Sequence, residues 1–212
     1  MSGGEQVNVL CVVAHPDDET LICGGTLAKH AEAGDDVCVF AFCFTRASGN
    51  YKAACETLGT QAISTDFPDQ RLDRESFSHL VGTIEMTDFP DPDLVITHHP
   101  SDLNLDHELV ARAVLTTFRP KPGQKPQTIL AGETPSSTEY SWGRPLFEPT
   151  WFEALSAEQL DKKIEALKHY STEVEVFPHP RSPTGLRNLA AVRGQQVGVE
   201  RAEAFQLLRR LR

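Results

Sequence analysis

The sequence lacks several features that define large classes of proteins. It has no stretch of about 18 apolar residues, so no membrane-spanning helix is expected. Bases are scarce relative to acids, with 20 Lys+Arg against 30 Asp+Glu and a formal charge of −10. A nucleic-acid binder needs a basic face to contact phosphates, which an acidic chain of this kind does not provide. The composition therefore predicts neither a membrane span nor a nucleic-acid partner.

Signals for export and for structural zinc are also missing. The first ten residues, MSGGEQVNVL, have neither a basic segment nor a long apolar segment, so no signal peptide is expected. The 5 cysteines are odd in number, show no CxxC spacing and fall in apolar runs, where cysteine packs as a small core residue. These features favour a reduced, cytoplasmic compartment. The 40% hydrophobic and 24% charged content is ordinary for a globular chain with a real core.

What is present is an alternation of strand and helix patterns. Unbroken apolar runs, typical of parallel strands buried on both faces, alternate with segments of helical spacing. The expected strands are residues 7–14, 36–43, 61–65, 93–99 and 128–132. The expected helices between them are residues 20–33, 50–58, 76–86 and 104–118. This rhythm predicts an α/β fold with a Rossmann-like, mainly parallel sheet flanked by helices.

The last third of the chain has a different pattern. Residues 133–151 and the proline-rich 177–183 are expected to be irregular. Ser156 and Gln159 form a capping box that opens a helix, and residues 200–211 show helical spacing. We expect one domain over 1–212, with a sheet core over about 1–132 and a helical and loop extension over about 133–212. The oligomeric state is left open, and a homo-oligomer is compatible with the sequence.

The first chemical cluster directly follows the first expected strand. It is His15-Pro16-Asp17-Asp18-Glu19, and the carboxyl ends of parallel strands are where open α/β sheets bind ligands. His15 and Asp18 could converge on one cation, since an imidazole nitrogen and a carboxylate suit zinc. Asp17 would remain available as a base. The simpler interpretation is that the three acids only start a helix. No GxGxxG follows the strand, which disfavours a dinucleotide-binding domain.

The second cluster follows the expected strand 93–99. The run THHPSDLNLDH, residues 97–107, has three His and two Asp, and it can face the first cluster across the sheet. His107 could be a third metal ligand, leaving an open position of the catalytic type. A metal there would activate a water and polarise a carbonyl, while Asp17 moves the proton, which suggests amide hydrolysis. The simpler alternative is a polar loop in which Asp102 or Asn104 caps a helix.

These residues resemble a known family. AHPDDE at 14–19, followed about ninety positions later by Asp-His, is similar to the zinc-dependent de-N-acetylases of the LmbE/PIG-L family. DLNLDH at 102–107, PSSTEY at 135–140 and FPHPRS at 177–182 extend the resemblance over nearly the whole chain. It implies a Rossmann-like fold and one Zn²⁺ held by His15, Asp18 and His107, although such ligands also accept Fe²⁺ or another divalent metal.

The resemblance also implies a mechanism and one departure from it. A water on the metal attacks an acetamide carbonyl, and Asp17 acts as general base. Several members of the family have a histidine at the position of Asn104 that stabilises the oxyanion and is oriented by the neighbouring acid, here Asp106. Asn104 can donate a hydrogen bond but cannot carry a proton. The alternative oxyanion donors are three histidines, namely His98, His99 and His179.

Substrate contacts are expected from residues near the same sheet edge and in the tail. The candidates are Arg46, Arg71, Ser137, Arg181 and Arg193, each of which could instead form a structural ion pair or turn. Residues 1–106 hold 18 of the acids and 5 of the bases, so most bases lie in the second half. Arg181 or Arg193 would then favour an anionic substrate such as a nucleotide-linked N-acetylated sugar.

Two other functions fit the same residues. One is an amidase that cleaves a larger acyl or thiol-sugar conjugate with the same site, differing only in the shape of the pocket. The other is a non-catalytic module that binds a sugar or nucleotide on a degenerate scaffold. The complete set of His15, Asp17, Asp18 and His107 favours an enzyme over that module.

Overall fold

The structure is a computed structural model, and it describes residues 6–44, 48–122 and 127–211. The strands are β1 (Asn8–Val13), β2 (Asp36–Phe44), β3 (Gln61–Pro68), β4 (Leu94–His98), β5 (Thr128–Gly132), β6 (Trp151–Ala154) and β7 (Ala202–Arg209). The helices are α1 (Asp18–Ala33), α2 (Ser48–Leu58), α3 (Phe77–Met86), α4 (Leu105–Thr117), α5 (Ala157–Lys168) and α6 (Pro183–Gln196), with short 3₁₀ turns η1 (Leu72–Arg74) and η2 (Thr138–Tyr140). No helix within these ranges has the length and apolar composition needed to cross a membrane.

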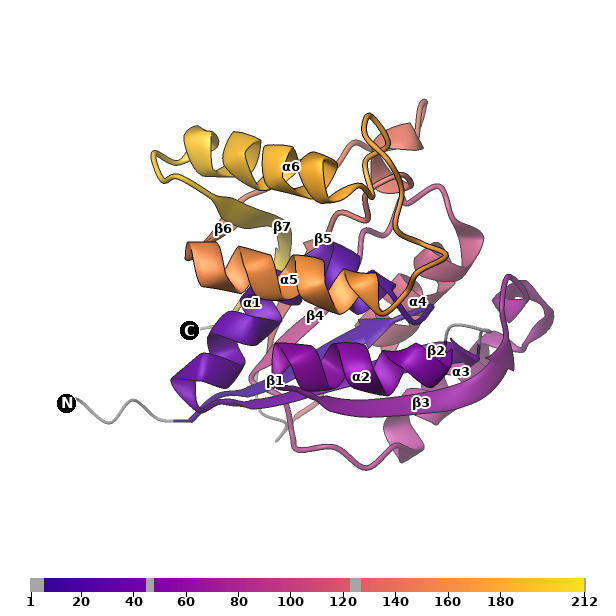
Figure 1. Cartoon of the computed structure of the whole chain (residues 1–212). Coiled ribbons are helices and arrows are strands. Elements are labelled where there is room, and N and C mark those ends of the chain that lie inside the picture. Colours follow the sequence, from indigo (N-terminus) through magenta and orange to yellow (C-terminus); the bar gives the residue numbers. More distant parts are fainter. Residues whose placement is uncertain (1–5, 45–47, 123–126, 212) are drawn as a thin grey trace.

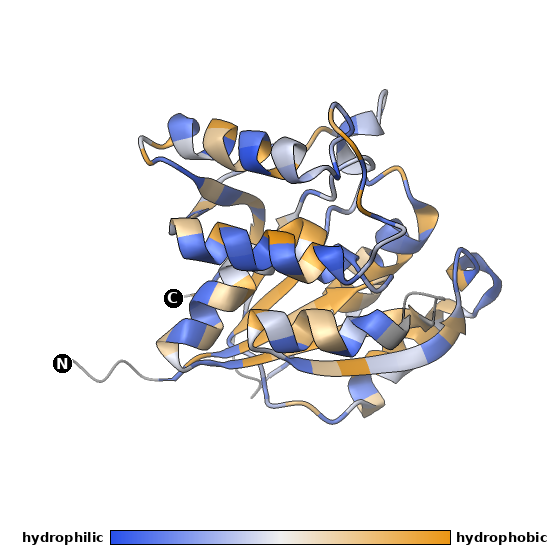
Figure 2. Cartoon of the chain, viewed as in Figure 1, coloured by the Kyte–Doolittle hydropathy of each residue, from blue (hydrophilic) through white to orange (hydrophobic). Residues whose placement is uncertain are grey.

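The strands form one sheet of order β3-β2-β1-β4-β5-β7-β6. The first five are parallel, and β7 and β6 are antiparallel additions at one end. Figure 2 shows the central strands as mostly hydrophobic, as expected for strands covered on both faces. The mainly parallel α/β class predicted from the sequence is confirmed. The strand order reverses between β1 and β4, which is where sheets of this kind bind ligands.

Two layers of helices enclose the sheet (Figure 1). One face packs against α1, α2, α5 and α6, and the opposite face packs against α3 and α4. Successive residues of β1 explain this arrangement, because Val9 and Cys11 enter the first core and Leu10 and Val12 the second. The capping box at Ser156 begins α5 as predicted, with both of its reciprocal hydrogen bonds present.

The predicted helix over residues 200–211 is wrong, because this segment is strand β7. Its apolar residues fit both periods, and alternation sends Phe205 and Leu207 to one core and Leu208 to the other. The deciding interaction is long-range. β7 pairs with the edge of β5 that β4 leaves unpaired, and so provides hydrogen-bond partners for the backbone groups of β5 on that side. Strand β6 and helix α6 were not predicted, although Ser182 followed by Pro183 is a helix-start signal.

A buried ion pair connects α1, α5 and β7. Helix α1 is kinked at Cys23, and the backbone N–H groups of Gly25 and Thr26 donate to the Glu203 carboxylate at 3.0 and 2.7 Å. Lys163 Nζ lies 2.6 Å from Glu203 Oε1 and donates to the Leu21 carbonyl at 2.9 Å. Both charged side chains are about 95% buried, at 5% and 6% exposure. The pair therefore fixes the helix that begins at Asp18.

We predict that Lys163→Met destabilises the protein by about 3 kcal/mol, because it leaves the Glu203 carboxylate buried without a cation. Lys162→Met is the matched control. Lys162 pairs with Glu32 at 2.8 Å on the surface, so its loss should cost less than about 1 kcal/mol. Urea unfolding of both variants measures the difference. Equal effects would contradict a stabilising role for the buried pair.

Candidate metal centre and active site

The two sequence clusters meet where the strand order reverses. His15 follows β1, Asp102 lies in the segment that connects β4 to α4, and His107 lies in the first turn of α4. Asp18 is the first residue of α1. The residues His15, Asp18 and His107 are buried, with 7%, 1% and 1% exposure. The carboxyl ends of two neighbouring parallel strands therefore bring together residues that are about ninety positions apart in sequence.

Three ligand atoms form a compact triangle, which we call the metal triad. His15 Nδ1 lies 3.1 Å from Asp18 Oδ2 and 3.2 Å from His107 Nε2, and the third side, from His107 Nε2 to Asp18 Oδ2, is 3.3 Å. Metal–ligand bonds of about 2.0 Å at tetrahedral angles would separate ligand atoms by about 3.3 Å. The spacing and the two-nitrogen, one-oxygen donor set thus fit zinc or a similar divalent ion. Three protein ligands leave a fourth position open.

Each histidine of the metal triad has a carboxylate on its other nitrogen. His15 Nε2 lies 3.2 Å from Asp106 Oδ2, and His107 Nδ1 lies 3.1 Å from Asp102 Oδ1. Carboxylates in this position fix the tautomer and the ring orientation of a metal ligand. Asp106 was predicted to orient an oxyanion group at position 104, but in the structure it contacts His15 instead.

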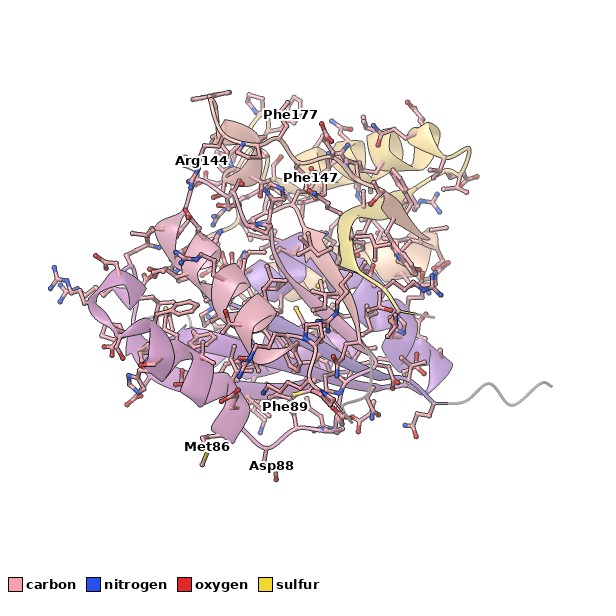
Figure 3. The ribbon with its side chains drawn as sticks, turned by 180° about the vertical axis from the view of Figure 1, so that it is seen from behind. Met86, Asp88, Phe89, Arg144, Phe147 and Phe177 are labelled. Carbon is pink, nitrogen blue, oxygen red and sulfur yellow. The ribbon has the colours of Figure 1, made fainter. Side chains whose placement is uncertain are left out.

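Asp102 is in turn held by the segment that follows β5. The hydroxyls of Ser137 and Thr138 donate to its two carboxylate oxygens, and Arg144 Nη1 donates to its backbone carbonyl at 2.9 Å. Burial raises the pKa of Asp102, but His107 and these hydroxyls outweigh burial and lower it to about 2. Ser137, a predicted substrate contact, is thus buried with its hydroxyl on Asp102. Figure 3 shows Arg144, Phe147 and Phe177 together at one end of the molecule, opposite Met86.

Asp17 has an unusual backbone conformation. Its φ of 115° lies in a region that non-glycine residues rarely adopt, and such residues concentrate at functional sites. The Asp17 N–H donates to Glu19 Oε2 at 3.0 Å, and the Tyr170 hydroxyl donates to Glu19 Oε1 at 2.8 Å. Burial raises the pKa of Glu19 to about 6. No role for Tyr170 could be predicted from the sequence, since nothing local distinguishes a tyrosine just after a distant helix.

The Asp17 carboxylate is buried beside other charges. Burial raises its pKa well above the usual range, and the neighbouring Asp18 charge adds to that effect. Arg181 opposes it, because Arg181 Nη1 lies 3.1 Å from Asp17 Oδ2. The same guanidinium contacts Glu173 at 2.9 Å, and its Nε donates to Ser136 Oγ at 2.7 Å. The structure therefore brings Arg181, from the proline-rich segment, directly to the candidate base.

The other predicted arginine contacts are distributed differently. Arg193 forms a bidentate pair with Glu133, at 2.7 and 2.6 Å, so its charge is already matched. Arg71 is exposed just after β3, and Arg46 lies outside the described residues. Among the described residues, neither Arg193 nor Arg71 has a contact with the metal triad.

The predicted oxyanion donors differ in whether they keep an N–H group that is free to donate a hydrogen bond. His98 Nε2 accepts the Ala14 N–H at 2.9 Å, its Nδ1 lies 3.3 Å from Thr134 Oγ1, and the ring stacks on His107. Burial lowers the pKa of His98 to about 3, so the ring is neutral. Both nitrogens of His99 are likewise engaged, by Gln206 at 3.0 Å and by a backbone N–H at 3.3 Å.

The remaining two donors keep a free N–H group. His179 Nδ1 accepts the Arg181 N–H at 3.2 Å, so the ring proton lies on Nε2, which has no hydrogen-bond partner among the described residues. Asn104 is the N-cap of α4, where its side-chain oxygen accepts the Asp106 N–H at 2.9 Å. The Asn104 amide nitrogen is 3.5 Å from Gln70 Oε1. Capping thus explains the oxygen of Asn104, and the hydrogen bond to Gln70 leaves one of the two amide N–H groups available.

The fold and the metal triad define an α/β protein with a candidate divalent-metal centre at the point where the strand order reverses. Residues 10–118 match the PIG-L family model, described as GlcNAc-PI de-N-acetylase, and the chain belongs to this family. The match includes every residue of the metal triad as well as Asp17.

Similar proteins include two described as deacetylases and one described as a hydratase. The uncharacterized deacetylase YaiS of Escherichia coli K12 is 29% identical over 189 residues, which are 81% of this chain and 94% of YaiS. The N,N'-diacetylchitobiose deacetylase of Pyrococcus horikoshii has a TM-score of 0.74 and 16% identity, covering 96% of this chain and 84% of that one. The hydratase GalB of Pseudomonas putida KT2440 also has a TM-score of 0.74, with 22% identity and 98% coverage of both chains.

Proposed function

We propose that this protein is a divalent-metal-dependent deacetylase that removes the acetyl group from an N-acetylated amino sugar or sugar conjugate. The observation that carries the proposal is the metal triad, three buried ligand atoms 3.1–3.3 Å apart, with Asp17 immediately beside it. The family description and the name of YaiS favour deacetylation over other reactions. Zinc is the preferred metal, and Fe²⁺ would fit the same donors.

The reaction adds water to the acetamide carbonyl and breaks the C–N bond, so that acetate and a free amine leave. A divalent ion in the metal triad would supply positive charge that polarises the carbonyl and makes a water more acidic. Asp17 accepts the proton of the attacking water on its carboxylate and then donates it to the leaving nitrogen. Glu19 and Arg181 hold Asp17 in place through its backbone N–H and its carboxylate.

The developing oxyanion also needs a hydrogen-bond donor. We assign this role to the free Nε2–H of His179, with the amide of Asn104 as the alternative, because His98 and His99 have no free ring nitrogen. Arg71 is exposed and could contact a charged group of the substrate.

Acetate release from a panel of free and nucleotide-linked N-acetyl sugars tests the proposal. We expect turnover with at least one of them, loss of turnover after chelation and recovery when zinc is added back. A series of longer acyl chains on the best substrate distinguishes a deacetylase from a broader amidase. Release of acetate that is unaffected by chelation would contradict the metal-dependent mechanism. Because the fold is shared with the hydratase GalB, hydration of an unsaturated carboxylic acid without any deacetylation would contradict the reaction class.

A further inference from the structure

The two ring nitrogens of His15 lie beside two different groups of possible metal ligands. Nδ1 belongs to the metal triad, whereas Nε2 lies 3.2 Å from Asp106 Oδ2 and 3.3 Å from Asp69 Oδ1. Cys43 Sγ lies 3.8 Å from Asp106 Oδ2. The ligand atoms of His15, Cys43 and Asp106 all lie within 4.8 Å of one another, and the three residues are buried. We call His15, Cys43, Asp69 and Asp106 the accessory cluster.

A local irregularity places the Cys43 thiol beside His15. Residues two apart in a regular strand point to the same face, but Ala41 packs in one core and Cys43 in the other. The register between β2 and β3 shifts between these two residues. Irregularities of this kind redirect side chains next to functional sites. The contacts of the thiol are long, 3.9 Å to the Pro68 carbonyl and 3.8 Å to Asp106, so hydrogen bonding alone does not explain its position.

The accessory cluster has the donor set of a soft metal site. One nitrogen, one sulfur and two carboxylate oxygens suit zinc or cadmium, whereas magnesium and calcium prefer oxygen alone. The nitrogen–oxygen distances of 3.2 and 3.3 Å match the separation of about 3.3 Å expected between tetrahedral ligands, and metal–sulfur bonds of about 2.3 Å lengthen the sulfur–oxygen side. The Asp69 side chain is 47% exposed, which gives an ion a route from solvent.

We propose that the accessory cluster is a second position for a soft divalent cation, and that an ion bound there opposes metal binding in the metal triad. The two positions share His15, and a neutral imidazole has one N–H and one coordinating nitrogen. When Nε2 coordinates, the ring proton lies on Nδ1, which then no longer serves the metal triad. Asp106 would also bind the ion and would no longer orient the His15 ring. Excess zinc should therefore inhibit the enzyme through Cys43.

Cadmium titration of the metal-free protein tests the site without turnover. Cadmium bound to a thiolate absorbs in the ultraviolet, and the metal triad contains no sulfur. We expect this absorption in the wild-type protein and in the control Cys55→Ser, which changes a buried cysteine of α2, but not in Cys43→Ser. A wild-type protein without the absorption would overturn the proposal. So would absorption that persists in folded Cys43→Ser, for example from Cys11 and Cys23, whose sulfurs are 3.5 Å apart.

Inhibition by excess zinc gives a second measurement. Cys43 is outside the metal triad, so Cys43→Ser should keep the basal activity while the inhibitory zinc concentration rises by at least about tenfold. Unchanged inhibition in Cys43→Ser would overturn the antagonism between the two positions. Because the cadmium absorption needs no substrate, failure of the proposed deacetylation and failure of the accessory cluster are separate results.

Discussion

Replacement of His107 by alanine should abolish both metal binding and acetate release. The substitution removes one of three protein ligands and leaves Asp102 buried beside an empty space, with its two hydroxyl donors but without the ring that it orients. Loss of a carboxylate behind a metal-bound histidine typically costs 10–100-fold in affinity, so loss of the ligand itself should cost more than about 100-fold. Elemental analysis of the purified variant and acetate release with added zinc measure the two effects.

His79→Ala is the control for this substitution. His79 is on the surface of α3, where its Nδ1 contacts Glu75 at 2.9 Å, so the variant should keep both metal and activity. Near-stoichiometric metal in folded His107→Ala would show that the metal is held elsewhere. Activity close to that of the wild type would show that the metal triad is not the catalytic centre.

The fold could be predicted where the sequence pattern is local. Buried parallel strands such as β1 and β4 are continuous apolar runs, and α4 and α5 begin after the capping residues Asn104 and Ser156, so the limits of these elements shift by a few residues at most. β7 was predicted as a helix because Ala204, Phe205 and Leu208 have helical spacing, although a strand buried on both faces accommodates them equally well. The segment is a strand because it pairs with the edge of β5 that β4 leaves unpaired, and β5 lies about seventy residues earlier in the sequence. Local periodicity contains no information about such a pairing.

The candidate site shows the same division between local and distant information. AHPDDE and the later Asp-His mark the metal triad because the residues lie in short motifs at strand ends. The residues that support them come from separate parts of the chain. Tyr170 reaches Glu19 from the end of α5, and Ser137 reaches Asp102 from the segment after β5. Nothing in the sequence around these hydroxyl side chains indicates a partner. Their partners are determined by how the helices and loops pack.

Replacement of Asp17 by asparagine should lower the rate of acetate release by about 10²–10⁴-fold without removing metal, because it deletes a proton carrier and no ligand. Asparagine has nearly the same shape, and its oxygen can still accept the Arg181 hydrogen bond. The backbone N–H that donates to Glu19 is unchanged. Steady-state kinetics should show a loss in kcat with little change in KM. The control Asp161→Asn, which removes a surface partner of Arg187, should leave kcat unchanged.

A second substitution separates proton transfer from charge pairing. If Asp17 served only to share the charge of Arg181 with Glu173, Arg181→Met in the Asp17→Asn background would remove the cation that has lost this partner and restore activity. If Asp17 carries the proton, the double variant stays inactive while its metal content and melting temperature remain close to those of Asp17→Asn. The two roles make opposite predictions. Deleting the guanidinium removes any need for charge balance, but it does not supply the proton that the acetamide nitrogen needs in order to leave. Recovery of acetate release in the double variant would therefore reassign Asp17 from base to ion-pair partner.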